Sequence, residues 1–346
     1  MKAHRSDQAK AKLYGKGQPV FAVAPMIDWT DRHCRFFHRQ LTTHALLYTE
    51  MVVADAIIHG PREKLLDYDA AEHPLALQIG GSDPEKLHAA VTVARDWGYD
   101  EFNLNVGCPS DRVQSGTFGA CLMREPERVG DGLAAMREAA GDLPVTVKCR
   151  LGVDDQDIEE ALDRLVDEAI RAAVSVIWVH ARKAWLEGLS PKENRDIPPL
   201  DYDRVGRLKV RVPDAFVGLN GGLKSAASAT DTISSLGLDG MMLGRAAYQT
   251  PDVLTEVDHL VYGEAASEFD YPALIAEMEE YAARHMERGG RLNHVTRHMV
   301  GLFNGLPGAR RWRQVLSTES TKPGVTPAIL SEAFAHVRLD AGREAA

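Results

Sequence analysis

The stretch FNLNVGCPS, residues 102 to 110, decides how the chain is interpreted. Apolar and polar side chains alternate from Phe102 to Val106, and the alternation stops at Gly107, Cys108 and Pro109. Such alternation predicts a β-strand, and the glycine and proline that follow predict its end. The sequence therefore places a thiol at the carboxyl end of a strand.

Seven further short runs of apolar or β-branched residues occur along the first 245 residues. They cover residues 19–25, 45–52, 73–80, 144–150, 174–180, 214–220 and 238–244. Segments with helical spacing separate most of these runs, for example residues 83–98 and 157–174. Eight strands that alternate with helices predict an α/β fold, a (β/α)8 TIM barrel. A doubly wound parallel sheet is the alternative, although no G-x-G-x-x-G motif follows any of the strands.

The composition excludes several classes of protein. The chain has 346 residues and 45% hydrophobic content, enough for a large core. Its four cysteines form no C-x-x-C pair, which argues against a disulfide framework and a zinc finger. No signal peptide and no apolar run of about 18 residues is present, so we expect a cytoplasmic protein without a membrane partner. The net charge of -10 argues against indiscriminate binding to nucleic acid.

The chain is expected to have three parts. Residues 1–18 are predicted to be a flexible, solvated tail, with a basic arm that contacts nucleic acid as the alternative. Residues 19–262 are predicted to form the barrel, and residues 263–346 an all-helical C-terminal domain. Residues 284–313 hold seven arginines against the single acid Glu287, a local balance of +6. This concentration predicts a phosphate-binding surface, with a solvated helical face as the alternative.

Polar and glycine residues stand at the predicted carboxyl ends of the strands, where function collects in TIM barrels. Lys148 lies in an otherwise apolar strand, so its ammonium group would be buried without a partner unless an anion meets it. Gly221, Gly222 and Gly244 follow the seventh and eighth strands, where barrels commonly bind phosphate, and Arg245 adds a positive charge. These features suit a phosphorylated planar cofactor, and flavin mononucleotide (FMN) is the natural candidate.

Several stretches of the chain resemble the tRNA-dihydrouridine synthases, and in particular the branch called dihydrouridine synthase A. The stretches are APMIDWTDRHCR, LQIGG, FNLNVGCPSDRVQSGTFGACLM, VTVKCRLGVDD, VHARKAWLEGLSPKENRDIPPLDYDRV, LNGGL, GLDGMMLGRAAYQTP and RHMVGLFNGLPGARRWR, in family order from about residue 20 to residue 316. The resemblance implies an FMN-bound barrel joined to a helical tRNA-binding domain. It also implies NADPH-driven reduction of the C5=C6 bond of uridine in the tRNA D-loop, at positions 20 and 20a, with no obligate protein partner.

The same resemblance implies a role for particular residues. Flavin contacts are implied at Pro25, Met26, Ile27, Gln78, Lys148, His180, Asn220, Gly221, Gly222, Gly244 and Arg245. Contacts with tRNA are implied at Asn105, Lys192, Arg195, Arg310 and Arg313, and Cys108 is implied as the proton donor. The loop of residues 109–120 is rich in Gly and Ser, and we expect it to close over bound uridine.

The chemistry explains why a thiol is needed. Saturating the uracil C5=C6 bond takes a hydride at C6 and a proton at C5, and a reduced flavin supplies only the hydride. An ordinary thiol, with a pKa of about 8.5, is mostly protonated at neutral pH and can give its proton to a carbanion-like carbon. A covalent nucleophile and an inert buried thiol are the alternatives for Cys108, although no Cys-His motif is visible nearby.

Two other functions stay open at this point. One is a small-molecule flavin reductase of the dihydroorotate dehydrogenase type, which could share the barrel, the lysine and the phosphate site. The other is an RNA-binding barrel without catalysis. The basic C-terminal segment argues against the first, and Cys108 together with Lys148 argues against the second.

Overall fold

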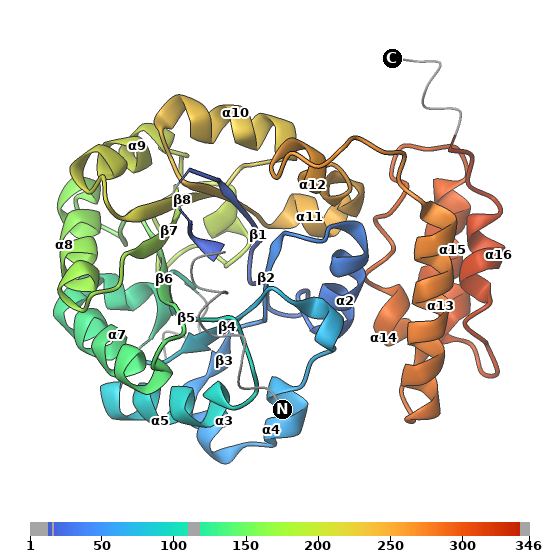
Figure 1. Cartoon of the computed structure of the whole chain (residues 1–346), viewed down its shortest axis with the longest axis horizontal. Coiled ribbons are helices and arrows are strands. Elements are labelled where there is room, and N and C mark those ends of the chain that lie inside the picture. Colours follow the sequence, from blue (N-terminus) through green and yellow to red (C-terminus); the bar gives the residue numbers. More distant parts are fainter. Residues whose placement is uncertain (1–12, 16, 110–117, 340–346) are drawn as a thin grey trace.

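The computed structural model describes residues 13–15, 17–109 and 118–339 (Figure 1). Most of the predicted tail, and most of the loop predicted to close over uridine, lie outside these residues. The described chain forms a parallel barrel surrounded by helices, with a helical C-terminal region packed at its side (Figure 1). The predicted fold class is confirmed.

Eight parallel strands close the barrel. They are β1 (Val20–Val23), β2 (Leu46–Tyr48), β4 (Leu75–Gly80), β5 (Glu101–Val106), β6 (Val145–Arg150), β7 (Val176–His180), β8 (Phe216–Asn220) and β9 (Gly240–Leu243). Each strand pairs with the next in this order, and β1 pairs with β9 to complete the circle. The short strand β3 (Val52–Val53) pairs with the end of β4.

Helices surround the barrel and build the C-terminal region. Around the barrel lie α2 (Arg32–Leu41), α3 (Ala54–His59), α4 (Arg62–Leu66), α5 (Pro84–Arg95), α7 (Pro126–Ala140), α8 (Ile158–Arg171), α9 (Tyr202–Arg211), α10 (Ala226–Leu236), α11 (Arg245–Gln249) and α12 (Val257–Leu260). The C-terminal region contains α13 (Tyr271–Glu287), α14 (Leu292–Thr296), α15 (Ala309–Thr318) and α16 (Ile329–Phe334). Among the described residues, none of these helices is both long and apolar enough to cross a membrane.

A chain of hydrogen-bonded polar side chains runs through the barrel interior. Asn105 donates to Gln78 over 2.8 Å, and Gln78 donates to Asn103 over 2.8 Å. Asn103 in turn donates to the hydroxyl of Thr146 over 2.7 Å, and that hydroxyl donates to Glu101 over 2.6 Å. All five side chains are buried, and burial raises the pKa of Glu101 to about 7. Each member therefore has a partner that offsets the loss of its hydration.

Tyr14 packs at the amino end of the barrel, where this polar chain ends. The hydroxyls of Tyr14 and Tyr48 both donate to the Glu101 carboxylate, the second over 2.6 Å. The Tyr14 ring meets Phe216 edge-on at 4.8 Å between centroids, and Leu13 packs against the same apolar cluster. The prediction that residues 1–18 form a solvated tail is therefore wrong for Leu13 and Tyr14. Tyr14 hydrogen-bonds the buried Glu101 carboxylate, and Leu13 packs against the apolar cluster.

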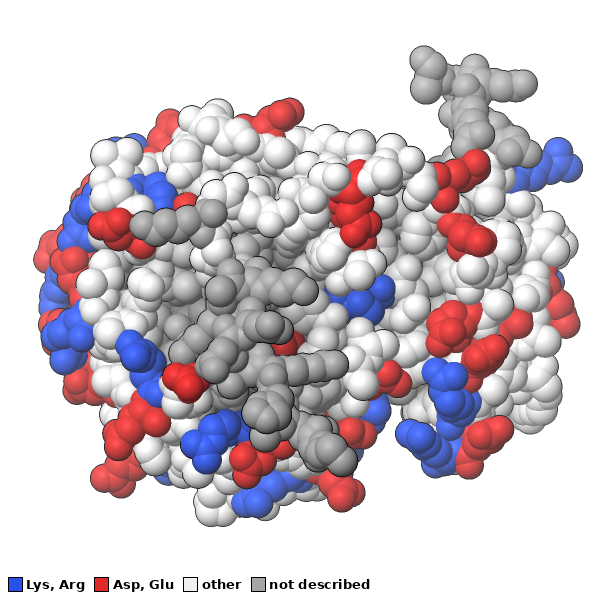
Figure 2. Space-filling view, viewed as in Figure 1, with Lys and Arg blue, Asp and Glu red and all other residues white. Residues whose placement is uncertain are grey.

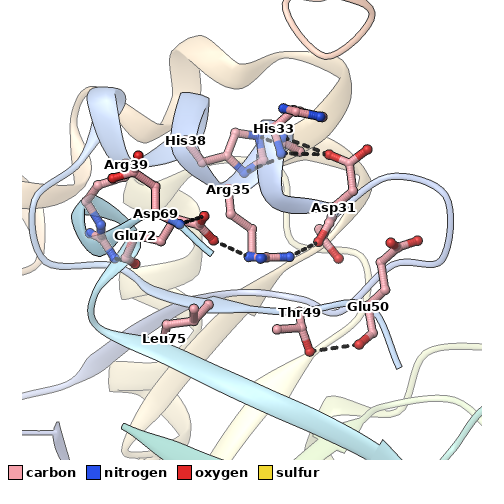
Figure 3. A network of polar contacts seen from close by, with 12 residues as sticks. Asp31, His33, Arg35, His38, Arg39, Thr49, Glu50, Asp69, Glu72 and Leu75 are labelled. Carbon is pink, nitrogen blue, oxygen red and sulfur yellow. Dashed lines mark hydrogen bonds and ion pairs between the residues drawn. The ribbon is translucent and has the colours of Figure 1, made fainter. Parts of the chain in front are cut away.

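Helix α2 connects the barrel to the C-terminal region. On the barrel side, Arg35 forms a 2.6 Å ion pair with the buried Glu72 (Figure 3). On the other side, Asp31 caps the start of α2 and accepts hydrogen bonds from Arg297 and His298. Burial by itself raises the pKa of Asp31, but the hydrogen bonds from His298 and Arg297 outweigh burial and lower it. The Asp31 carboxylate therefore stays charged and links the two parts of the chain.

Candidate active site at the barrel mouth

Cys108 is held on a turn at the carboxyl end of β5. The side-chain oxygen of Asn105 accepts hydrogen bonds from the backbone N–H groups of Gly107, over 3.0 Å, and Cys108, over 2.9 Å. Arg150 donates to the Gly107 carbonyl over 2.9 Å, and the backbone of Ala120 donates to the Cys108 carbonyl over 2.9 Å. The thiol thus sits partly exposed on a turn fixed from both sides.

Three cationic side chains of the described residues, Lys148, Arg150 and Arg195, lie close enough to Cys108 to interact with its charge. Burial is the main cause that lowers the pKa of all three, and a negative charge on Cys108 opposes this shift. Burial, followed by the nearby charge of Arg150, lowers the pKa of Lys148 to about 8. Among the described residues Lys148 has no hydrogen-bond or ion-pair partner. An enclosed amine in this state favours an anion beside it.

His180 and the two glycines after β8 form the next part of the mouth. Burial, then the charges of Arg150 and Lys148, lower the pKa of His180, so its imidazole is neutral at neutral pH. Gly221 and Gly222 have φ of +108° and +72°, a region that side chains disfavour. A Cβ on Gly221 would lie 2.6 Å from the His180 ring. Only bare backbone therefore fits here.

Arginines gather beside the glycines. Arg245 donates to Asp196 over 2.7 Å and to the Arg195 carbonyl over 3.3 Å. Besides burial, the charge of Arg245 lowers the pKa of both Arg182 and Arg195, so the three guanidinium groups lie near one another. The three guanidinium groups outnumber the single carboxylate of Asp196, so this part of the mouth is positively charged and suits a phosphate.

The remaining predicted flavin contacts line the same mouth. Pro25, Met26 and Ile27 follow β1, and the turn is closed by Thr30, which bonds the backbone of Met26 in both directions. Gly244, at the start of α11, lies beside this turn, since a Cβ there would be 3.6 Å from the Met26 sulfur. Farther round the mouth, Gln78 is part of the polar chain, and Asn220 donates to the Met242 carbonyl over 2.7 Å.

The five predicted tRNA contacts do not form one surface. Asn105 is buried, and its amide holds the Cys108 turn. Lys192 and Arg195 are exposed on the loop after β7 and lie next to the mouth. Arg310 and Arg313 lie apart from them on α15 in the C-terminal region, where Arg313 donates to Asn304 over 3.3 Å.

The basic balance of residues 284–313 is smaller than the sequence count implies. Arg284 pairs with Glu277, Arg297 with Asp31, and Arg311 with Glu319, and all three acids lie outside the segment. On the face shown in Figure 2, acidic and basic side chains are mixed over the C-terminal helices. The count of +6 therefore overstates the local positive charge, because it left out acids that the fold brings close, and the phosphate-binding surface stays a prediction.

Two residues at the mouth lacked an assigned role in the sequence analysis. Arg150 stood at a strand end, and the structure uses it to bond Gly107 and, over 2.9 Å, the Asn194 carbonyl. Arg182 was not singled out, although it stands two residues after His180, the end of β7. Arg150 is the last residue of β6, and Arg182 follows the last residue of β7 by two, so a place at the carboxyl end of a strand was the available signal for both arginines.

Known proteins resemble this chain in fold and in sequence. Morphinone reductase matches 74% of this chain and 88% of its own with a TM-score of 0.50 at 13% identity, which concerns the fold alone. The tRNA-dihydrouridine(20/20a) synthase of Shewanella oneidensis is 51% identical over 93% of this chain and 95% of its own length. That of Xanthomonas campestris pv. campestris is 51% identical over 94% and 96%.

A family model gives the same result over nearly the whole length of the chain. The model of the dihydrouridine synthases matches residues 22–337, a range that contains the barrel strands from β2 to β9 and the C-terminal helices. Both Cys108 and Lys148 lie within this match. This protein therefore belongs to the dihydrouridine synthase family.

Proposed function

We propose that this protein is a tRNA-dihydrouridine synthase that reduces the C5=C6 bond of uridines 20 and 20a in the tRNA D-loop. The observation that carries the proposal is the placement of the Cys108 turn beside the enclosed, unpaired ammonium of Lys148. Relatives that are 51% identical over almost the full chain carry the name tRNA-dihydrouridine(20/20a) synthase. A small-molecule reductase and a non-catalytic RNA-binding barrel are not favoured.

The mouth residues fit FMN. Within the described part of the chain, Lys148 offers a positive charge without a competing acid, and Gly221 and Gly222 present bare backbone near Arg182, Arg195 and Arg245. The neutral ring of His180 packs against Gly221 and presents an uncharged wall. When bound and reduced by NADPH, FMN supplies the hydride for C6 of uracil.

Cys108 supplies the proton. Its S–H bond breaks as a C–H bond forms at C5 of uracil, and the electron pair stays on sulfur. The resulting thiolate lies near Lys148, Arg150 and Arg195, whose positive charges stabilise it. Solvent then returns a proton to the thiolate. The hydrogen bonds that Asn105 accepts from the backbone and that Arg150 donates to it keep the turn in place while the charge on sulfur changes.

The tRNA is expected to contact two parts of the chain. A uridine in a folded tRNA must leave its base stack to reach a barrel mouth, so the surrounding phosphates need to be gripped. Lys192 and Arg195 lie beside the mouth, and Arg310 and Arg313 share one face of α15, three residues apart. We assign these four residues to phosphate contacts and the region from residue 263 onward to a tRNA-binding domain.

A reconstituted reaction tests the function. Purified protein is incubated with FMN, NADPH and an unmodified tRNA transcript, and dihydrouridine is mapped by mass spectrometry of RNase fragments. We expect a mass increase at positions 20 and 20a, which the Cys108→Ala variant should produce about 10²-fold or more slowly. A tRNA left unmodified by flavin-loaded protein, or modified only at other positions, would refute the assignment.

A further inference from the structure

Three histidines from three helices meet where the C-terminal region packs on the barrel. His33 lies on α2 of the barrel, His285 on α13 and His294 on α14. One ring nitrogen of each can be chosen so that all three lie within 4.8 Å of one another. Imidazole nitrogens are the donors that zinc and neighbouring divalent metals prefer. The cluster lies outside the barrel mouth and has no part in the reaction proposed above.

The spacing of the rings matches a shared metal ion. The Nε2 atom of His285 is 3.1 Å from the Nδ1 atom of His294, and two nitrogens on one tetrahedral zinc ion are about 3.3 Å apart. The rings of His33 and His285 have centroids 4.4 Å apart. Closing the site around an ion thus takes shifts of about an ångström in side chains.

The rings are also held in position. A Cβ on Gly290 would lie 2.1 to 2.4 Å from three atoms of the His285 ring, so Gly290 packs directly against the face of that ring. The Nδ1 atom of His33 bonds the hydroxyl of Tyr281 at 2.9 Å, which leaves its Nε2 atom for a metal. Metal-binding histidines commonly use their second nitrogen in this way.

A second group of possible metal ligands, His44, Asp258 and Glu264, serves as a contrast. Asp258 already accepts hydrogen bonds from the hydroxyl of Thr42 and the backbone of Thr43 and His44. His44 pairs with Glu264 at 2.6 Å. The carboxylates of this second group are therefore occupied by hydrogen bonds and an ion pair within the fold, whereas the three-histidine cluster consists of imidazole donors alone.

We propose that His33, His285 and His294 bind one zinc ion, which links helix α2 of the barrel to helices α13 and α14. Three histidines leave a fourth position of the tetrahedron to water. Because the ligands come from both parts of the chain, the ion binds only when the C-terminal region is docked. Zinc should therefore stabilise the assembled fold.

Zinc binding to the full chain, without a histidine tag and stripped of metal by a chelator, tests the proposal. We expect calorimetry to show one zinc ion bound per chain and thermal unfolding to shift to higher temperature as zinc is added. Cobalt in place of zinc should give the visible absorption of a tetrahedral site. His294→Ala removes an exposed ligand, so it should leave the metal-free Tm unchanged but weaken zinc binding at least about tenfold.

Two control variants make the result specific. His59→Ala changes an exposed histidine at the end of α3 and should keep both zinc affinity and the Tm shift. His44→Ala changes the second group of possible ligands and should also keep the zinc affinity and the Tm shift of the wild type. Equal zinc affinity in His294→Ala and wild type would overturn the proposal, as would loss of binding in His44→Ala or a wild type that binds no zinc.

Discussion

Replacing Lys148 by Met should stabilise the FMN-free protein while weakening its hold on FMN. Burial, with Arg150 as a further cause, lowers the pKa of Lys148 from 10.5 to about 8. One pKa unit is equivalent to about 1.4 kcal/mol, so the enclosed ammonium costs the fold up to about 3 kcal/mol at neutral pH. Methionine has a similar length and no charge. We therefore expect the free energy of unfolding to rise by up to about 3 kcal/mol at pH 7.

The pH dependence provides an internal check. Below pH 8 Lys148 is charged in both the folded and the unfolded chain, whereas between about pH 8 and pH 10.5 only the unfolded chain keeps the proton. The unfolded state then binds more protons, so the stability of the wild type rises with pH through this window. Lys148→Met lacks this titration, and its advantage should shrink from pH 7 toward pH 10.

Urea unfolding of FMN-free protein at pH 7 and at pH 9.5, paired with FMN titration by fluorescence quenching, measures both effects. Lys86→Met is the matched control, because Lys86 is exposed and pairs with Asp55 at 2.9 Å. Because substitutions of exposed residues seldom change stability much, the free energy of unfolding of Lys86→Met should match that of the wild type. A Lys148→Met protein that is less stable than wild type at pH 7 would refute the reasoning, since Lys148 would then have a compensating partner in the fold.

Three further outcomes are expected. Cys108→Ala should leave flavin reduction by NADPH near wild type and slow dihydrouridine formation about 10²-fold or more in single-turnover assays; a parallel loss of both would make the residue structural. Changing Arg310 and Arg313 together to Ala should weaken tRNA binding and lower its salt dependence by up to about one unit per lost phosphate contact, at unchanged FMN content; equal slopes would contradict the docking role. Tyr14→Phe removes a hydrogen bond to the buried Glu101 carboxylate and should lower the free energy of unfolding by about 1.5 to 3 kcal/mol in urea; an unchanged value would mean that Glu101 is satisfied without it.

The order of strands could be predicted from the sequence because strand and helix periodicities are local. The alternation from Phe102 to Val106 predicted a strand and β5 covers Glu101–Val106, while the helix predicted over 157–174 is α8, Ile158–Arg171. The grouping of Lys148, His180 and Gly221 at one mouth follows from the same prediction. Parallel strands in a closed barrel bring all their carboxyl ends to one face.

Contacts between distant segments could not be predicted in this way. Tyr14 and Glu101 are 87 residues apart, and no local pattern connects them. The charge of residues 284–313 depends on acids such as Asp31, which lies at the far end of the sequence. Asn105 is an intermediate case, since an asparagine that bonds the N–H groups two and three residues later is a recognisable turn pattern. The family resemblance assigned it to tRNA instead.

The polar chain inside the barrel also determines which strand alignment the folding chain can accept. Glu101, Asn103 and Asn105 occupy alternate positions of β5, and each has a partner on a neighbouring strand. A slip of β5 by one residue would turn all three toward the apolar layer beneath the helices, and a slip by two would leave their amide and carboxylate groups facing the wrong partners. Apolar packing alone is compatible with several registers of β5. The chain of hydrogen bonds is complete in only one register, and every other register would leave buried polar groups without partners.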